Sequence, residues 1–287
     1  EATKRALTKA LDPAPPAPAE TTRTAFVPEW RDNTRAFGIS LQLYQLRSAR
    51  NLGIGDLGDL NKLIGPFAAW GADFIGLNPL HALFTAEPER ASPSSPSVRR
   101  FLNPLIIAVD EVPGFRPEML RAVKVPPADD LVDYTAVAHA KLAVLREIHN
   151  AWRTADPAVP ETARLAALRH ASAGGEALYA FALFEALSHH MVKEGHGASW
   201  VGWPATYHHM ATPDVRDFAA AHACEIAFHT WLQHIAEAQL AVTQAAALRA
   251  GMRIGLYLDI AIGSVPDGAA TCVDPELAVR GVSVGAG

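Results

Sequence analysis

The first residues that could do chemistry form a glycine-rich stretch, NLGIGDLGDL. Gly53, Gly55 and Gly58 match the spacing G-x-G-x-x-G of dinucleotide-binding loops, in which a pyrophosphate lies against a bare helix N-terminus. In those loops the glycines directly follow a strand, but here RSARN intervenes, and Asp56 would repel a phosphate. We therefore expect a tight turn into a helix, with Asp56 or Asp59 capping its first amides. An NAD-dependent oxidoreductase would rest on this loop alone and is set aside.

Three polar side chains come near the ends of apolar segments. Asn78 and His81 follow the apolar part of DFIGLNPL, which ends without the acid that a dinucleotide ribose needs. Asp259 lies near the end of GLYLDIAIG, where an unpaired buried carboxylate is costly. In an α/β barrel the carboxyl ends of the strands carry the site. These residues are candidates for a polar pocket, although an ion pair with an arginine or a capped turn explains Asp259 equally well.

Asparagines and aromatic side chains could bind a sugar. Asn78 and Asn103 both occur in the string Leu-Asn-Pro-Leu. Asparagine donates to and accepts from hydroxyl groups, but it also caps turns before proline, and we favour that structural role. The aromatic residues of SWVGWPATYHHM, 199–210, could stack on sugar rings, with packing in a core as the favoured alternative.

Metal and nucleophile motifs are missing from the sequence. The adjacent pairs His189-His190 and His208-His209 lack the spaced partners of a zinc site, so we predict no metal. The strings G-x-S-x-G, H-E-x-x-H and the P-loop do not occur. Carboxylates are plentiful, but no pair is placed on facing strand ends by its spacing. The residues alone predict an α/β domain with a polar pocket and no assignable catalytic residue.

The elements that must position these residues follow from hydrophobic periodicity. Residues 37–46 alternate as a strand does, and residues 73–80 form a second short apolar strand. Between them, residues 59–71 repeat apolar side chains at i, i+3, i+4 and i+7, which is one face of a helix. Gly71 is expected to end that helix, and Pro66 to mark a kink or a boundary. A strand, a helix and a strand favour a parallel sheet with crossover helices.

The rest of the chain alternates less regularly. Residues 84–100 form a polar loop, 101–112 a strand, and helical patterns dominate 134–196. One long helix is expected over 214–251 and a buried strand over 252–263. We predict an α/β fold, a partial (β/α)8 TIM barrel with a helical insertion subdomain, whose chain ends after about the third barrel strand. Its regions would be a linker at 1–25, the first barrel strands and loops at 26–112, a mainly helical insertion at 113–213, and the long helix with the next strand at 214–287.

Composition excludes several classes of protein. The 287 residues carry a net charge of −5, with 49% hydrophobic and 19% charged residues, as a globular protein does. Lysine and arginine are scattered, so we expect no binding to nucleic acid or to an anionic membrane. The apolar runs are shorter than the roughly 18 residues of a membrane span. Cys224 and Cys272 are the only cysteines, which favours a reducing cytoplasm over a disulfide framework.

Several longer strings resemble one bacterial enzyme family. They are FGISLQLYQLRSARNLGIGDLGDL, GADFIGLNPLHALF, SPSSPSVRRFLNPL, FALFEALS, GWPATY, FHTWLQ and GLYLDIAIGSVPDGA. From about Phe26 onward, the chain resembles the 4-alpha-glucanotransferases, also called amylomaltases or disproportionating enzymes, of glycoside hydrolase family 77 in the alpha-amylase clan. The resemblance covers what would be the N-terminal part of such an enzyme.

The resemblance implies a cytoplasmic (β/α)8 barrel with helical insertions that needs no cofactor. It implies transfer of an alpha-1,4-glucan segment to the 4-hydroxyl of an acceptor glucan or glucose. The expected partners are therefore maltodextrins, amylose and glycogen-derived chains. The family mechanism is retaining: a carboxylate nucleophile forms a glucosyl-enzyme, and a glutamate acts as acid and then as base.

The family's three catalytic carboxylates have no counterpart in this chain. The nucleophile follows an Arg-x-Asp string on the fourth barrel strand, and the other two come later, so we expect the chain alone to be inactive. Asp259 corresponds to the acid of the clan's first conserved region, which lines the site without being one of the three. With it, the substrate-binding candidates are His81, Asn78, Asn103 and Ser94.

Several positions depart from the family pattern. Ser94 stands where a glucan-contacting tyrosine is usual, and Leu52 and Leu258 stand where tryptophan and arginine are common. Ile106 and Ala108 replace a frequent tyrosine and aspartate. A non-catalytic glucan-binding protein, or a degenerate remnant, is therefore the alternative function. Because an open half-barrel exposes strand edges, we expect the isolated chain to be poorly soluble.

Overall fold

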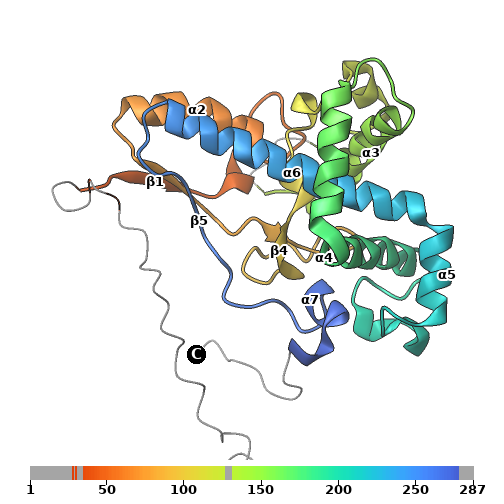
Figure 1. The fold of residues 1–287 in the computed structure, drawn as a ribbon. Coiled ribbons are helices and arrows are strands. Elements are labelled where there is room, and N and C mark those ends of the chain that lie inside the picture. The colour runs from red at the N-terminus through yellow and green to blue at the C-terminus, as the bar shows by residue number, and fades with distance from the viewer. Residues whose placement is uncertain (1–27, 29, 31–34, 127–130, 278–287) are drawn as a thin grey trace, which may run out of the picture. The chain divides into compact units, whose positions relative to one another are not determined.

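A three-stranded parallel sheet organises the unit formed by residues 37–287. The computed structural model describes residues 28, 30, 35–126 and 131–277. The strands β1 (Gly38–Leu41), β2 (Phe74–Leu77) and β5 (Gly255–Leu258) pair in the order β1-β2-β5. Helices α2 (Leu57–Ala69) and α6 (Ala223–Arg249) lie side by side along the sheet (Figure 1). The predicted parallel sheet with crossover helices is confirmed.

The two faces of the sheet differ because successive side chains of a strand point to opposite sides. Ile39, Ile75 and Leu256 are register partners and pack in the same core cluster as apolar residues of α2 and α6. Phe74 and Tyr257 lie on the other face, with ring centroids 5.8 Å apart. The described sheet is open, with β1 and β5 as its edges.

The strands are shorter than the sequence predicts. Residues 37–46 form β1 and then a 3-10 turn at Leu43–Gln45. The strand expected over 252–263 is limited to β5, and the prediction that it is buried was wrong. Tyr257 and Leu258 expose 62% and 42% of their surface, because β5 is an edge strand that pairs with β2 on one side.

Helix α2 begins where the acidic residues predict. The Asp56 carboxylate accepts from the amides of Gly58 and Asp59, and the Asp59 side chain accepts from the Asp56 amide. This reciprocal arrangement is a capping box, which satisfies amides that a helix N-terminus leaves without partners. Both aspartates therefore cap the helix.

Gly71 ends α2 as predicted, but Pro66 is not a boundary. Gly71 has φ +87°, and its amide and the next one turn back to the carbonyls of Ala68 and Phe67. This hydrogen-bond pattern is a Schellman motif, in which glycine adopts the left-handed conformation without strain. The helix runs through Pro66 to Ala69.

The strand expected over 101–112 was wrong. Strand β4 (Val98–Leu102) pairs antiparallel with the short β3 (His81–Ala82) and ends at Leu102. The chain then forms 3-10 turns at Pro104–Ile106 and Val109–Glu111. Because proline has no amide hydrogen, Pro104 cannot donate to a β ladder.

In this segment, glutamine side chains of α6 make the backbone hydrogen bonds that a neighbouring strand would otherwise make. The side-chain amide of Gln233 accepts from the Leu102 amide and donates to the Leu102 carbonyl, at 2.9 and 2.8 Å. Gln239 binds Ala108 in the same way, at 2.8 and 2.9 Å. The apolar residues therefore become buried without forming a strand, because their backbone is satisfied by side chains.

Helices dominate the middle of the chain, as expected for 134–196. Helix α4 (Glu161–Lys193) contains Gly175, whose φ of +53° is not helical. Two helical segments therefore meet at this residue. The single helix expected over 214–251 was wrong, because His222 has a non-helical backbone between α5 and α6. The remaining elements are α3 (Tyr134–Arg153), α4 (Glu161–Lys193), α5 (Pro213–Ala221) and α7 (Ala269–Val273), with 3-10 turns at Pro117–Ala122, Trp200–Gly202, Ala205–Tyr207 and Pro275–Leu277.

Helix α6 passes through three hydrophobic clusters. Ile226 packs with residues of α4 and α7, and Ala247 packs near the sheet. Between them, Phe228, Trp231 and Ile235 belong to the cluster that α3 covers. The i, i+3, i+4, i+7 spacing of these apolar residues therefore identifies a helix whose apolar side chains are buried in the core along most of its length. Among the described residues, no helix is long and apolar enough to cross a membrane.

Candidate functional site

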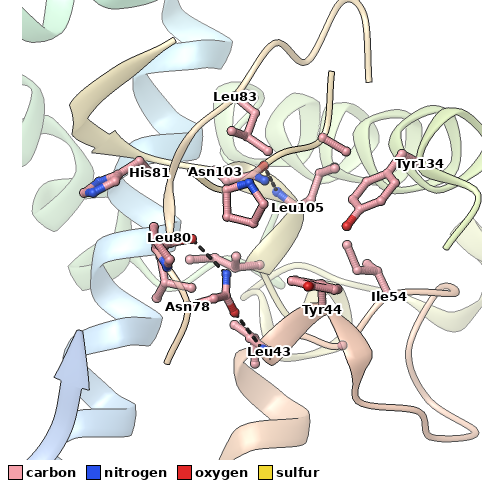
Figure 2. Close-up of a pocket in the computed structure, with 15 residues that line it drawn as sticks. Leu43, Tyr44, Ile54, Asn78, Leu80, His81, Leu83, Asn103, Leu105 and Tyr134 are labelled. Atoms are coloured by element: carbon pink, nitrogen blue, oxygen red, sulfur yellow. Dashed lines mark hydrogen bonds between the residues drawn. The ribbon is translucent and has the colours of Figure 1, made fainter. Parts of the chain in front are cut away.

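A small cavity lies beyond the carboxyl ends of β1 and β2 (Figure 2). Its volume is about 30 Å³, which is room for roughly one water molecule. Three of the five predicted binding residues, Asn78, His81 and Asn103, line it, together with Tyr44 and Tyr134. The fold therefore brings side chains from distant parts of the chain to the strand ends.

Asn78 joins the ends of two strands. Its Oδ1 accepts from the Leu43 amide at 2.8 Å, and its Nδ2 donates to the Pro79 carbonyl at 2.8 Å. Leu43 begins the turn that follows β1, so the side chain holds that turn beside β2. Asn78 therefore has a structural role, but as a link to a distant turn and not as the cap of a turn before proline that the sequence favoured, and it also lines the cavity.

Asn103 caps the turn after β4. Its Oδ1 accepts from the Leu105 amide at 3.0 Å, and Pro104 occupies the first position of the 3-10 turn. Its own amide donates to the Leu80 carbonyl at 2.9 Å. The side chain thus fixes one wall of the cavity.

His81 faces away from the two tyrosines and toward the segment after β5 (Figure 2). Its Nε2 accepts from the Ala261 amide at 3.2 Å, so the neutral ring carries its proton on Nδ1. Burial lowers the pKa of His81 and the Arg99 charge adds to this, while a bond with the Arg99 backbone and the Asp259 carboxylate oppose it. At neutral pH this histidine is an uncharged group that holds the chain beside Asp259.

Asp259 lies at the carboxyl end of β5 with an exposed side chain. Its amide donates to the Leu77 carbonyl at 3.2 Å, and its Oδ1 accepts from the Ile260 amide at 2.8 Å. Arg99 Nη1 donates to the carbonyls of Ala261 and Ile262, at 3.2 and 3.0 Å. The carboxylate is therefore on a braced segment and is open to solvent.

Ser94 lies in an exposed turn between β3 and β4. The Ser95 amide donates to the Ser92 carbonyl at 3.1 Å and closes the turn. The neighbouring Pro93 lines the cavity, while Ser94 itself is exposed. Whether any of the five predicted residues binds a ligand stays a prediction.

Two cavity residues escaped the sequence reasoning. Tyr44 follows β1, and Tyr134 is the first residue of α3. Figure 2 shows both rings beside the cavity, on the side opposite to His81. Burial and the neighbouring Tyr44 raise the pKa of Tyr134, so the Tyr134 phenol is protonated at neutral pH. Ninety residues separate them in the sequence, so only the fold reveals the pair.

The glycine loop has a steric cause at each position. Gly53 has φ +86°, a conformation that other residues adopt with strain. A Cβ on Gly55 would lie 2.0 Å from the Leu43 carbonyl oxygen, and one on Gly58 would lie 2.7 Å from Glu111 Oε1. The helix amides that would bind a phosphate are bound by Asp56. These contacts support setting the dinucleotide interpretation aside.

A buried ionic cluster holds this loop against α3. Arg50 Nη1 lies 2.5 Å from Asp56 and 3.0 Å from Asp59. The fully buried Lys141 of α3 donates to the Leu105 carbonyl at 2.7 Å and lies 3.5 Å from Asp56. Burial lowers the pKa of Lys141, and the Asp56 charge opposes that shift. The cluster is a structural support for the cavity wall.

The aromatic segment at 199–210 packs rather than forming an open platform. Trp203 is buried and donates from Nε1 to the Gly197 carbonyl at 3.0 Å, and Trp200 donates to Thr271 at 3.1 Å. His208 bonds to the Trp203 carbonyl. In the part of the chain that the structure describes, no three His, Cys, Asp or Glu side chains come together as metal ligands would.

Fold and site together define an α/β protein with a polar, tyrosine-lined cavity at the ends of parallel strands. The family model described as 4-alpha-glucanotransferase, glycoside hydrolase family 77, matches residues 41–287. The chain therefore belongs to the 4-alpha-glucanotransferase family, as its motifs indicated.

Individual relatives agree with this family. The chain is 32% identical over 280 residues to a 4-alpha-glucanotransferase of Haemophilus influenzae, covering 92% of this chain and 40% of the relative. It is 35% identical over 276 residues to one of Mycobacterium tuberculosis, covering 91% of this chain and 37% of the relative. The chain thus spans about two fifths of the length of the curated relatives that it matches.

Solved structures of amylomaltases have the same fold. The one from Corynebacterium glutamicum matches 82% of this chain and 32% of its own, with a TM-score of 0.59 and 28% identity. The one from Streptococcus agalactiae, solved with acarbose, matches 85% of this chain and 47% of its own, with a TM-score of 0.69 and 19% identity. The second likeness is used for the fold alone.

Proposed function

We propose that the protein containing this chain is a 4-alpha-glucanotransferase that moves alpha-1,4-glucan segments to the 4-hydroxyl of an acceptor glucan or glucose. The observation that carries the proposal is the family match over residues 41–287. Its substrates are maltodextrins, amylose and glycogen-derived chains, and it needs no cofactor. Family membership is also the basis for expecting a cytoplasmic enzyme.

The sheet supports a barrel that continues beyond β5. Tyr257, Ile260 and Ile262 expose 62%, 67% and 96% of their surface on and after this edge strand. Exposed apolar strand edges are unfavourable in a finished protein, and a fourth parallel strand on β5 would cover this one. The three strands and their helices are then the first part of a (β/α)8 barrel, with the site at the carboxyl ends.

The reaction divides between this chain and the rest of that barrel. A carboxylate outside this chain attacks the anomeric carbon as a glutamic acid protonates the leaving oxygen, which releases the donor's reducing-end fragment. The acceptor 4-hydroxyl then loses its proton to the same glutamate and attacks the glucosyl carbon, which frees the carboxylate. This chain holds none of the three catalytic carboxylates of the family.

The residues of this chain would bind the glucan. Asp259 at the β5 end would accept from sugar hydroxyls near the reacting carbon, braced by His81. Tyr44 and Tyr134 offer aromatic faces and hydroxyl groups beside Asn103. A mixture of flat apolar surface and amide or carboxylate groups suits sugar rings, which have apolar faces and polar edges.

The exposed Ser94 favours the alternative of a non-catalytic glucan-binding protein or degenerate remnant. A serine in this turn cannot supply the ring contact that the family tyrosine makes. Such a protein would bind maltodextrins without producing new chain lengths. The alternative therefore differs from the transferase in turnover and not in ligand.

Kinetics of site variants in the intact protein test the assignment. We expect Asp259→Asn and Tyr44→Ala each to lower kcat/KM for maltoheptaose by about tenfold, because each loses a substrate contact of about 1–2 kcal/mol. Trp70→Ala is the matched control. Trp70 lies just after α2, is 69% exposed, and has its ring beside that of Phe67. Transfer with both site variants unimpaired would refute the site, whereas binding of maltoheptaose without transfer by the wild type would refute the transferase.

A further inference from the structure

We propose that a second cavity, between α3, α4 and α6, binds a small organic anion with an apolar body, such as an aryl-substituted short-chain carboxylate. The three helices meet in this part of the unit (Figure 1). The cavity has a volume of about 520 Å³, which falls within the usual 300–1,000 Å³ of small-molecule sites. It shares no lining residue with the cavity at the strand ends.

The walls of this cavity are apolar and aromatic. Trp152 of α3 and Trp231 of α6 pack edge to face with ring centroids 5.5 Å apart, and both are buried. Leu178 and Ile226 are buried in the wall, whereas Leu168 of α4 exposes 67% of its surface. A ligand with an apolar body would cover this surface and gain the free energy of removing it from water.

The charges around the cavity have one sign. Arg153 at the end of α3 and Arg164 in the first part of α4 are the charged residues that line it. Arg164 Nη1 donates to the Val159 carbonyl at 2.6 Å, which holds the guanidinium in place. Two guanidinium groups with no carboxylate among the lining residues favour an anion, and a carboxylate accepts two parallel bonds from each.

The other ionisable groups near the cavity are a buried histidine in its wall and carboxylates outside its lining. His149 lines the wall, and burial lowers its pKa to about 4, so it is neutral at pH 7. Glu225 of α6 forms an ion pair with Arg146 at 2.7 Å, Glu237 lies 2.9 Å from His170 Nε2, and neither carboxylate lines the cavity. The formal charges among the lining residues are therefore those of Arg153 and Arg164.

A glucan does not fit this cavity. Its many hydroxyl groups would lose water without finding partners, because the hydroxyl of Thr230 already donates to the Ile226 carbonyl and most of the wall is hydrocarbon. The site is thus distinct in chemistry from the strand-end cavity. The helical segment before Gly175, where the backbone has φ +53°, forms one wall.

The test is titration of the intact protein with 4-phenylbutyrate, followed by tryptophan fluorescence and calorimetry. We expect one saturable site that Arg164→Gln weakens about tenfold, since a charge-assisted bond to the carboxylate is lost. Arg169→Gln removes an exposed charge from the same helical segment outside the lining and should leave binding unchanged. The neutral amide, 4-phenylbutyramide, should bind about tenfold more weakly than the acid.

A cavity-filling variant locates the site. Ala171→Phe places a ring in the cavity and should abolish binding, with the near-UV circular dichroism and melting temperature recorded to verify the fold. Absence of saturable binding by the wild type would overturn the proposal. Equal binding of acid and amide, or of wild type and Arg164→Gln, would overturn the anion preference that defines it. Glucan transfer plays no part in these readouts, so they stand apart from the proposed function.

Discussion

Glu185 of α4 is a buried carboxyl group that forms no ion pair within the part of the chain that the structure describes. Its Oε2 accepts from the Thr85 hydroxyl at 2.6 Å, and the same hydroxyl lies 2.8 Å from His189 Nε2. Among the described residues, the buried Oε1 atom has no hydrogen-bond partner, nor has Nε2 of His229, whose ring lies 5.3 Å from that of His189. Burial raises the pKa of Glu185 to about 7, and the Thr85 hydrogen bond opposes that shift. The network joins α4 to α6 inside the core.

This carboxyl predicts a pH-dependent stability. The pKa of Glu185 is raised in the folded protein. Its contribution to the free energy of unfolding is therefore fully present below about pH 4.5 and is lost as pH rises to about 7. Burial lowers the pKa of His149, His189 and His229, which costs stability in the opposite direction, as pH falls below about 6.5. A comparison of two variants at each pH cancels the histidine contribution.

We expect Glu185→Gln to gain stability relative to the wild type as pH rises from 5 to 7, by up to about 1.4 kcal/mol per pH unit. Glutamine keeps an oxygen that accepts from Thr85 but cannot ionise. The measurement is the free energy of unfolding by urea at pH 5, 6, 7 and 8. A difference between the variants that stays constant over this range would show that Glu185 titrates normally.

At the scale of single residues, the sequence predicted local roles, such as capping, better than it predicted which distant residues come into contact. Asn103 was expected to cap a turn, and Asp56 and Asp59 a helix, because these roles depend on residues within three positions. The pairing of Tyr44 with Tyr134, and of His81 with Ala261, depends on how distant segments fold together. Such contacts leave no local signal.

Among the elements, α2 shows what periodicity and capping can predict. Its apolar face, its acidic start and its glycine end are local features, and all three are present in the structure. The segment 101–112 shows the limit, because its partners are Gln233 and Gln239 of α6. An apolar run predicts burial, whereas forming a strand also needs a neighbour.

Gly65 within α2 and Gly71 just after it give a pair of substitutions to compare. Gly65 is exposed inside the helix and Gly71 follows it with φ +87°, and a Cβ at either position would meet no atom of a more distant part of the chain within 4 Å. We expect Gly65→Ala to leave the stability within about 0.5 kcal/mol of the wild type, because the gain in helix propensity is offset by contact between the new Cβ and the ring of Pro66. Gly71→Ala should destabilise it by about 1 kcal/mol, because alanine is strained in the left-handed region.

Thermal or urea unfolding of both variants beside the wild type measures the difference. A Gly71→Ala variant that is as stable as Gly65→Ala would contradict this account, since only Gly71 has the left-handed backbone conformation.

At the scale of the whole molecule, the uncovered edge of the sheet at β5 governs solubility. The α/β class followed from the order of apolar segments, but closure into a barrel is beyond the described strands. If the sheet continues, Ile260 and Ile262 are covered in the intact protein. If the 287-residue chain is produced alone, they are exposed to neighbouring molecules.

We therefore expect the isolated chain to aggregate, and Ile262→Lys to raise its soluble fraction. Val201→Lys is the control, because Val201 is also exposed, at 58%, but lies in the Trp200–Gly202 turn away from β5. Sedimentation and size-exclusion chromatography give the soluble and monomeric fractions. A wild-type chain that is monomeric and melts cooperatively above about 50 °C, as ordinary mesophilic domains do, would show that the edge needs no cover.

We propose that this chain is part of a working glucan transferase and supplies substrate contacts, while the catalytic carboxylates lie outside it. The most direct measurement is incubation of maltotriose with the intact protein and, separately, with the 287-residue chain, followed by chromatography of the products. The account predicts glucose together with maltodextrins longer than maltotriose from the intact protein and unchanged maltotriose from the chain alone. Unchanged maltotriose with the intact protein, or new chain lengths from the 287 residues alone, would contradict it.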